Sequence, residues 1–383
     1  MNFNSTPFSK EEAARYQRQI ILPQFAIEGQ QKLKEAKVLI IGCGGLGSPV
    51  LLYLAAAGVG TIGFIDFDVV EESNLQRQIL FAKEDIGKQK SVVAKQKLEA
   101  LNPYIKLKNY TEKLSSKNAL EIIKEYDVVA DGSDNFPTRY LVNDACVLLN
   151  KPLIYAAIFQ FEGQVSVFNY TNNDGSIGPN YRDLYPTPPP PQQVPSCEEG
   201  GVLGMVAGII GSMQALEIIK VATGIGHTLS GRLFLLDALN FETRTIKIKR
   251  QPANPVNGKQ PTITELIDYD HFCGMKELQN EVKQVTPKEL KEARERGEDI
   301  QVIDVREPHE YEVANIGGTL IPVATIIDNI DKIDREKKVV LHCKGGSRST
   351  KAIKELEEKF GFTNLYNLQG GITAYLSEAE NED

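Results

Sequence analysis

Residues 37–48, KVLIIGCGGLGS, decide the fold of the first part of the chain. The apolar run 37–42 predicts a buried parallel strand, and its glycines predict a tight turn into an apolar helix at 46–57. Another short apolar run follows at 61–65 and ends next to Asp66. A strand, a glycine-rich turn, a helix and a second strand together predict the start of a doubly wound, Rossmann-like α/β sheet.

The alternation of strands and helices continues to about residue 250. Beyond the first unit, we expect helices at 88–102 and 202–222 and strands at 126–130, 153–157, 164–169, 232–237 and 243–250. The helix at 202–222 is apolar along its length, so we expect it to be buried. Residues 171–196 break the pattern with Pro, Asn and Gly, and so long a stretch without periodicity is usually functional or disordered.

A second α/β pattern begins near residue 281. It consists of expected strands at 301–304 and 339–342 and expected helices at 287–296 and 347–360. This alternation predicts a small α/β domain. We therefore expect a first domain at 1–258, a linker at 259–280 and a second domain at 281–383.

The composition excludes several classes of protein. The 383 residues are enough for two or three domains. The net charge of -8 makes a nucleic-acid partner a poor fit, because that binding rests on phosphate neutralisation. We see no apolar run of about 18 residues and no apolar N-terminal segment, so we expect no membrane span and no secretory signal. The five widely spaced cysteines fit a reducing cytoplasm.

The turn after the first strand is the first candidate site. Gly42, Gly44, Gly45 and Gly47 let backbone amides approach a phosphate, and the helix that follows presents its N-terminus to the same group. Asp66, at the end of the next strand, is placed to accept hydrogen bonds from ribose hydroxyls. These features alone fit an NAD-dependent dehydrogenase, an ATP-dependent enzyme or a tight turn without a ligand.

Further polar residues favour ATP over NAD. They follow the strands or open helices: Asn74, Arg77, Gln78, Lys90, Asp134 and Asn135. A triphosphate under attack needs cations on the leaving pyrophosphate, as Arg77 and Lys90 would provide, and a carboxylate such as Asp134 to hold Mg²⁺. A dehydrogenase needs neither. Each residue alone reads as a solvated surface group, but together they favour an ATP site.

Several motifs in this region resemble the MoeB/ThiF family of adenylyltransferases, which are related to ubiquitin-activating enzymes. They are RYQRQ at 15–19, GCGGLGS at 42–48, DFDVVEESNLQRQ at 66–78, GKQK at 87–90 and DGSDN at 131–135. The resemblance covers roughly residues 10–258. It implies that ATP and Mg²⁺ are bound by Asp66, Asn74, Arg77, Lys90 and Asp134. It also implies that Arg18 reaches into the active site of a partner protomer, and hence a homodimer.

The same resemblance implies a protein substrate. In the family, the C-terminal glycine of a small ubiquitin-like protein attacks the α-phosphate of ATP, which gives an acyl adenylate and pyrophosphate. Cys197 lies just before the helix at 202–222, and a thiol near a helix N-terminus is a better nucleophile because its pKa is lowered. It matches the family's thioester-forming or disulfide-forming cysteine. The alternative is an inert loop thiol.

One departure from the family concerns zinc. Many members bind a structural zinc with two Cys-x-x-Cys pairs. Here the matching stretches read NYRD at 180–183 and NPVN at 254–257, so all four thiol positions are changed and the spacing is kept. Without thiolates there is no soft tetrahedral site. We therefore expect the domain to fold without zinc.

The second domain has its own cysteine motif, HCKGGSRS at 342–349. Cys343 follows a buried strand, and the loop that opens the next helix can surround a sulfur anion with its amides and Arg348. The expected loop residues are Lys344, Gly345, Gly346, Ser347, Arg348 and Ser349. Four residues separate Cys343 from Arg348, against five in cysteine phosphatases, and this tighter loop fits a persulfide better than a phosphate.

Two flanking stretches agree with this reading. VIDVREPHEYEVANIGG at 302–318 and LQGGITAY at 368–375 resemble rhodanese sulfurtransferases, although NIGGT stands where HIPGA is usual and Tyr375 where Trp is common. The resemblance implies that Cys343 carries a persulfide. The alternative is a degenerate rhodanese domain with a passive cysteine.

Taken together, one domain would activate a carboxylate and the other would supply sulfur. The expected product is a thiocarboxylate on a ubiquitin-like sulfur carrier of the MoaD, ThiS or Urm1 kind, which feed molybdopterin, thiamine or tRNA thiolation. Cys197 would resolve the intermediate, and a cysteine desulfurase or a small donor would supply the persulfide. Two rival hypotheses are an NAD-dependent oxidoreductase fused to a sulfurtransferase and a non-catalytic scaffold for a ubiquitin-like protein.

Overall fold

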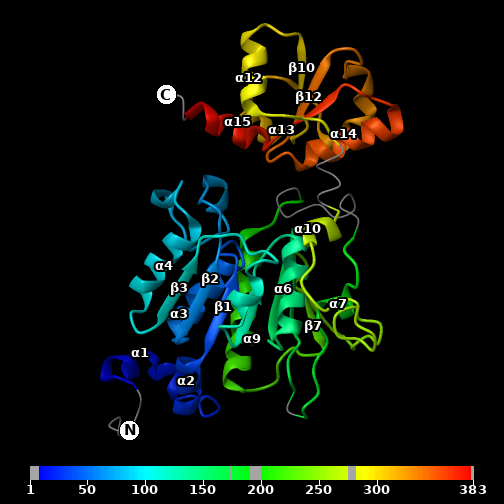
Figure 1. The fold of residues 1–383 in the computed structure, drawn as a ribbon. Helices are drawn as coiled ribbons and strands as arrows, with labels where there is room; N and C mark the ends of the chain where they lie inside the picture. Colours follow the sequence, from blue (N-terminus) through cyan, green and yellow to red (C-terminus); the bar gives the residue numbers. More distant parts are fainter. Residues whose placement is uncertain (1–7, 173, 190–199, 275–281, 381–383) are drawn as a thin grey trace. The chain divides into compact units, whose positions relative to one another are not determined.

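The computed structural model describes residues 8–172, 174–189, 200–274 and 282–380. The chain divides into two compact units, with the boundary between Cys273 and Gly274. Each unit is a sheet with helices packed against it (Figure 1). The predicted α/β fold class is therefore confirmed for both parts of the chain.

The first unit is built on an eight-stranded sheet of order β3-β2-β1-β4-β5-β6-β7-β8. The strands are β1 (Lys37–Ile41), β2 (Thr61–Ile65), β3 (Lys106–Tyr110), β4 (Val128–Asp131), β5 (Leu153–Phe159), β6 (Glu162–Phe168), β7 (Arg232–Asp237) and β8 (Glu242–Lys247). The first five strands of this order, β3, β2, β1, β4 and β5, pair in parallel. Strands β6, β7 and β8 continue the sheet with antiparallel pairing.

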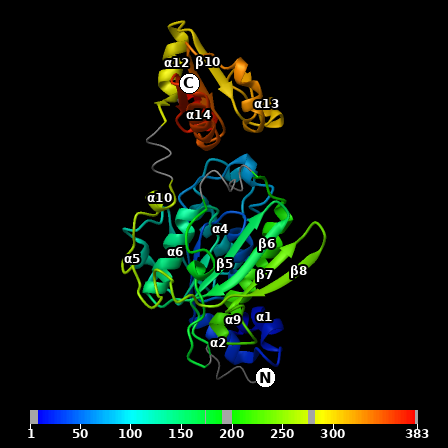
Figure 2. The ribbon, with the colours of Figure 1, turned by 90° about the vertical axis from the view of Figure 1, so that its right-hand side faces the viewer.

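Helices cover both faces of this sheet (Figure 1, Figure 2). The described helices of this unit are α1 (Lys10–Ile20), α2 (Ala26–Glu35), α3 (Gly47–Ala57), α4 (Lys90–Leu101), α5 (Ala119–Ile123), α6 (Phe136–Leu148), α7 (Tyr181–Leu184), α9 (Gly204–Thr223) and α10 (Tyr269–Phe272). One core layer lies under α3, α4 and α9, and a second lies under α5 and α6. The two layers explain why the central strands are apolar on both sides.

Helix α9 is less buried than we expected. It packs against β5, β6 and α3, but Met205, Ile209 and Leu216 stay 67%, 38% and 53% exposed. By length and composition α9 is apolar enough to cross a membrane. In this structure one apolar side of α9 packs on the sheet, and the described residues of this chain leave the other side uncovered.

The boundary between the units also differs from the expected linker at 259–280. The segment up to Cys273 belongs to the first unit. Tyr269 of α10 donates a hydrogen bond from its hydroxyl to Asp144 Oδ2 (2.8 Å), and the Phe272 ring lies 5.3 Å from that of Tyr140 on α6. Both contacts join residues that are far apart in the sequence, so the local composition of this segment indicated a linker.

The second unit contains a five-stranded parallel sheet of order β11-β10-β12-β13-β9. Its elements are β9 (Gln284–Val285), α12 (Pro287–Glu295), β10 (Ile300–Asp304), α13 (Pro308–Val313), β11 (Thr319–Leu320), β12 (Lys338–His342), α14 (Ser347–Phe360), β13 (Leu365–Leu368) and α15 (Gly371–Glu380). Helix α14 packs on one face of the sheet and α12 and α15 pack on the other. The carboxyl end of β12 leads directly into the cysteine loop.

Candidate functional site

A cavity opens at the carboxyl ends of β1, β2 and β4, where the sequence predicts a nucleotide site. The structure brings nine of the predicted residues to its wall: Gly42, Gly44, Gly45, Asp66, Arg77, Gln78, Lys90, Asp134 and Asn135. Open α/β sheets bind their ligands at this edge, outside the strand ends. The predicted residues thus form one surface although they span almost a hundred positions.

The glycine turn is held in place by Asp66. Its two carboxylate oxygens accept hydrogen bonds from the amides of Cys43 (2.8 Å) and Asp68 (2.9 Å). Burial raises the pKa of Asp66, and the charge of Lys90 and these two amides oppose that rise. Gly47 does not line the cavity, but a Cβ there would collide with the carbonyl oxygen of Gly42. It is needed for the close approach of turn and helix.

The cations and one buried acceptor define the polar side of the cavity. The Lys90 side chain is 8% exposed, and its Nζ lies 3.1 Å from Asp68 Oδ2. Arg77 donates from Nη1 to the carbonyl of Ser73 (3.0 Å). The buried Oε1 of Gln78 has no hydrogen-bond partner among the described residues. A buried acceptor at a cavity wall is costly unless a ligand donor reaches it, so the wall fits a polar ligand such as a nucleotide.

Two predicted residues have structural roles as well. Asn74 is buried and does not line the cavity, but its carbonyl accepts the amides of Arg77 (3.1 Å) and Gln78 (2.9 Å) and so shapes the turn that presents them. Asn135 is the N-cap of α6, where its side chain accepts the amide of Thr138 (3.0 Å). Asp134 is exposed at the cavity rim beside it.

Sequence reasoning missed Arg139 on α6. This side chain lines the cavity, with its guanidinium 5.7 Å from the ring of Phe136 and 5.9 Å from the ring of Tyr155. The available signal was its place one helical turn after Asn135, because residues i and i+4 share a helix face. The DGSDN motif ends at Asn135, four residues before Arg139.

Two other predicted residues lie outside this cavity. Arg18 is exposed on α1, whose Tyr16 hydroxyl accepts a hydrogen bond from Asn102 (2.8 Å) and lies against Gly58 just beyond the end of α3. The cavity lies at the other end of α3, so Arg18 has no route to the site of its own chain. Cys197 lies outside the described residues.

The four positions that the resemblance implies as zinc ligands converge in the structure, but they hold no thiolates. Asn254 Nδ2 donates to Asp183 Oδ1 (2.8 Å) and Asn180 Oδ1 (3.2 Å), and Asn180 Nδ2 donates to Asn257 Oδ1 (2.9 Å). Asn180, Asp183 and Asn254 are 0%, 6% and 2% exposed. Direct hydrogen bonds therefore join the two loops at these positions, and a set of three side-chain amides and one carboxylate does not fit a structural zinc site, which uses thiolates and imidazoles.

The sulfur loop of the second unit is formed by the residues predicted for it. Lys344, Gly345 and Gly346 make the turn after β12, and Ser347, Arg348 and Ser349 begin α14. The Cys343 side chain is buried, and its Sγ accepts the amide of Gly346 (3.1 Å). A sulfur at the start of a helix, facing a backbone N–H, is placed to be stabilised as an anion.

The floor of the loop is a glycine turn before α15. The amide of Ile372 donates to the Cys343 carbonyl (2.9 Å), and a Cβ at Gly371 would collide with the carbonyl oxygens of Cys343 and Lys344. Ser349 Oγ lies 3.5 Å from Sγ and donates to Asn367 Oδ1 (2.6 Å). The LQGG motif is thus explained by close packing behind the sulfur.

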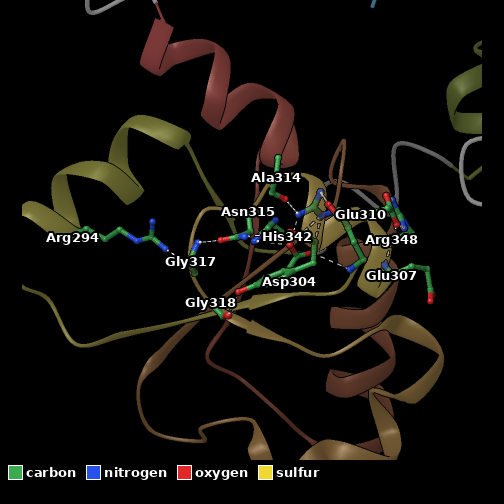
Figure 3. A network of polar contacts seen from close by, with 12 residues as sticks. Arg294, Asp304, Glu307, Glu310, Ala314, Asn315, Gly317, Gly318, His342 and Arg348 are labelled. Carbon is green, nitrogen blue, oxygen red and sulfur yellow. Dashed lines mark hydrogen bonds and ion pairs between the residues drawn. The ribbon is translucent and has the colours of Figure 1, made fainter. Parts of the chain in front are cut away.

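Charged residues form a connected network that reaches the loop at Arg348 (Figure 3). Arg348 pairs with Glu310 of α13 through both terminal nitrogens, at 2.6 and 2.7 Å. Behind it, Arg306 donates to both oxygens of Asp304, which is fully buried at the end of β10. His342 is 1% exposed, and burial lowers its pKa. The DVREPHE stretch therefore supplies the charges that support the loop.

Comparisons with known proteins agree with this geometry. Residues 16–256 match the ThiF family, and residues 286–378 match the rhodanese-like domain. The chain belongs to the ThiF family and carries a C-terminal rhodanese domain. Both resemblances inferred from the motifs are confirmed.

Similar proteins cover both parts of the chain. A probable adenylyltransferase/sulfurtransferase MoeZ of Mycobacterium tuberculosis is 46% identical over 98% of this chain and 96% of its own length. A sulfur carrier protein adenylyltransferase of Thermus thermophilus is 54% identical over 70% of this chain and 99% of its own. Among solved structures, E. coli MccB with ATP aligns with a TM-score of 0.55 and 26% identity, over 64% of this chain and 74% of that one. Of these three proteins, the MoeZ relative aligns with nearly the full length of this ThiF family member.

Proposed function

We propose that this ThiF family member uses ATP to adenylate the C-terminal glycine of a ubiquitin-like sulfur carrier protein. Sulfur from a persulfide on Cys343 then converts the activated carboxylate to a thiocarboxylate. The observation that carries the proposal is the convergence of Arg77, Lys90 and Asp134 on the glycine turn, in one chain with a buried cysteine at a helix start. The printed names of the MoeZ and Thermus thermophilus relatives support it.

The first step needs charge stabilisation more than covalent help. The carboxylate of the carrier attacks the α-phosphorus of ATP, and pyrophosphate leaves with the electron pair of the broken P–O bond. The turn amides and the start of α3 face the phosphates, and Lys90 and Arg77 stabilise the negative charge on the leaving group. Asp134 would hold the Mg²⁺ that accompanies ATP. Arg139 adds a third cation at the cavity wall.

The second step joins the two chemistries. The terminal sulfur of the Cys343 persulfide attacks the acyl carbon, AMP leaves, and the carrier is bound to Cys343 through an acyl disulfide. Cys197 would then attack Sγ of Cys343, which releases the thiocarboxylate and leaves a disulfide between the two cysteines. An external thiol reductant would restore both thiols. A cysteine desulfurase or another sulfur donor would reload Cys343.

The rival hypotheses account for fewer of the observations. An NAD-dependent oxidoreductase does not need the cations at 77 and 90 or the carboxylate at 134, and the similar proteins are named adenylyltransferases. In a non-catalytic scaffold, the hydrogen bond from the buried amide of Gly346 to the Cys343 sulfur would have no function. We therefore favour the enzyme, acting in the cytoplasm without a nucleic-acid or membrane partner.

We further propose that the active form is a homodimer. The exposed side of α9, with Met205, Ile209 and Leu216, is an apolar surface of the kind that marks protein interfaces. Arg18 has no access to the cavity of its own chain, so any role in adenylation requires a second protomer. A twofold dimer would place two such residues at two composite sites.

Mixing two inactive variants tests the dimer. Arg18→Ala and Arg77→Ala would damage different halves of a composite site, so exchange of subunits creates one intact site in each heterodimer. We expect a 1:1 mixture to regain about a quarter of wild-type ATP–pyrophosphate exchange, since half of the dimers are mixed and each has one intact site. A mixture no more active than its components, under conditions where subunits exchange, would rule out the shared site.

Metal content gives a separate prediction. We expect purified protein to contain no stoichiometric zinc, because the two loops are already closed by hydrogen bonds between amides and a carboxylate. Elemental analysis measures this directly. As a control, restoring thiols with Asn180→Cys, Asp183→Cys, Asn254→Cys and Asn257→Cys should create a site that takes up about one zinc. About one zinc per wild-type chain would contradict the expectation.

A further inference from the structure

The ion pair between Glu310 and Arg348 has a consequence for the sulfur donor. Arg348 lies in the first turn of α14, five residues after Cys343, and it is one of the two cations of the motif, the other being Lys344 within the loop. Both of its terminal nitrogens donate to the Glu310 carboxylate, at 2.6 and 2.7 Å. The two side chains are only 14% and 23% exposed. A bidentate pair of this kind is among the stronger charge-assisted contacts in proteins.

Glu310 is itself held firmly. Its Oε2 accepts the amide of Glu307 (3.0 Å), and its carbonyl accepts a hydrogen bond from Arg306 (3.2 Å), which is anchored on buried Asp304. Burial disfavours the charged carboxylate, but the hydrogen bonds from Arg348 and Glu307 outweigh it and keep the pKa of Glu310 below its ordinary value. The pair is therefore intact at neutral pH, and α13 is tied to the first turn of α14, where the sulfur loop ends (Figure 3).

This arrangement separates two classes of sulfur donor. Thiosulfate brings a sulfonate group, and its sulfur is taken up as RS⁻ + S₂O₃²⁻ → RSS⁻ + SO₃²⁻, so negative charge accumulates on the leaving sulfite. A persulfide gives RS⁻ + R′SSH → RSSH + R′S⁻ and needs no oxyanion site. Backbone amides such as that of Gly346 can donate hydrogen bonds to the sulfur with either donor. A sulfonate group also needs a cation that is able to pair with its oxygens.

We infer that Glu310 is a positioning residue that keeps the guanidinium group of Arg348 paired with its own carboxylate. As a result, Cys343 takes sulfur from a persulfide in preference to a small oxyanion donor. The inference rests on the proposed function and specifies the donor chemistry of the same site. Glu310 is not proposed to contact the sulfur or a substrate. It acts through Arg348, whose charge it neutralises.

The test compares two donors on Glu310→Gln in the full-length protein. Loading of Cys343 is followed by the mass gain of one sulfur atom, with thiosulfate or glutathione persulfide as donor. We expect kcat/KM for thiosulfate to rise about tenfold, the effect of one charge-assisted contact made available, and kcat/KM for the persulfide to stay within about twofold. The matched control is Glu312→Gln, an exposed carboxylate on the same helix, which should change neither value.

A double variant separates the electrostatic role from a structural one. In Glu310→Gln/Arg348→Gln the gain with thiosulfate should vanish, because the charge that Glu310 had neutralised is gone. If Glu310→Gln instead lowers the rate with both donors by the same factor, or leaves thiosulfate loading unchanged while the fold persists by circular dichroism, the inference is overturned. Absence of loading by either donor in the wild-type protein would instead refute the proposed function of Cys343.

Discussion

Replacing Cys343 by alanine is expected to abolish sulfur transfer to the carrier and to leave carrier-dependent ATP–pyrophosphate exchange at the wild-type rate. The reason is the separation of the two chemistries. The cavity that holds Arg77, Lys90 and Asp134 belongs to the first unit, and Cys343 lies in a loop of the second, which has its own sheet and core. Removing one sulfur atom there takes away the only proposed carrier of the persulfide.

The measurement is mass spectrometry of the carrier after incubation with ATP and either thiosulfate or a cysteine desulfurase. The Cys343→Ala variant should form acyl adenylate and no thiocarboxylate. Cys197→Ala is the useful comparison, because it should still load a persulfide on Cys343 even if release of the product fails. If the carrier still exchanges oxygen for sulfur without Cys343, sulfur arrives by another route and the rhodanese domain is an accessory.

Arg77→Ala or Asp134→Ala should lower ATP–pyrophosphate exchange by about 10²–10³-fold, the usual effect of losing one contact to transition-state charge. Arg77 is half-buried beside the glycine turn, with its Cγ 3.6 Å from where a Cβ on Gly45 would lie. Asp134 stands at the cavity rim, where it would hold the Mg²⁺ of the proposed ATP complex. The fold should persist, because neither side chain is part of the hydrophobic core.

A matched control for lost charge is Lys95→Ala on α4, whose exposed ammonium group faces Glu99 at 4.0 Å. It should leave exchange unchanged. Asp134→Asn should also raise the concentration of Mg²⁺ needed for half-maximal exchange, because an amide is a weaker ligand for a hard cation than a carboxylate. Wild-type exchange in both Arg77→Ala and Asp134→Ala would remove the adenylation assignment.

Several strands and helices could be predicted because their hydrophobic pattern in the sequence matches their burial in the fold. The strands at 37–42 and 61–65 and the helix at 46–57 match β1, β2 and α3 within one residue at each end. The two strands are apolar because they are buried on both sides, and α3 is apolar because it packs between the sheet and α9, so composition and fold carry the same information. Edge strand β3 was missed, since its residues KLKNY are largely polar and its position at the sheet edge leaves one side in solvent.

The candidate site also contains residues that could be predicted from the sequence and residues that could not. The position of three glycines, Asp66, Arg77 and Lys90 at the cavity could be predicted because they lie in motifs next to predicted strands. Arg139 was missed, although it shares a helix face with Asn135, because its relevance depends on where α6 begins beside the cavity. The role of Asn74 was also different, since it presents Arg77 and Gln78 through its carbonyl.

By itself, the sequence determined the two α/β units, the glycine turn at β1 and the cysteine loop at β12, because strand and helix periodicity and turn chemistry are local properties. Only the tertiary structure decided which distant groups meet. It placed Asn180 against Asn254 and Asn257, tied α10 to α6 through Tyr269, and joined Glu310 to Arg348. These contacts follow from how the strands are ordered and the helices packed, and no local pattern encodes a hydrogen bond between side chains so far apart in the chain.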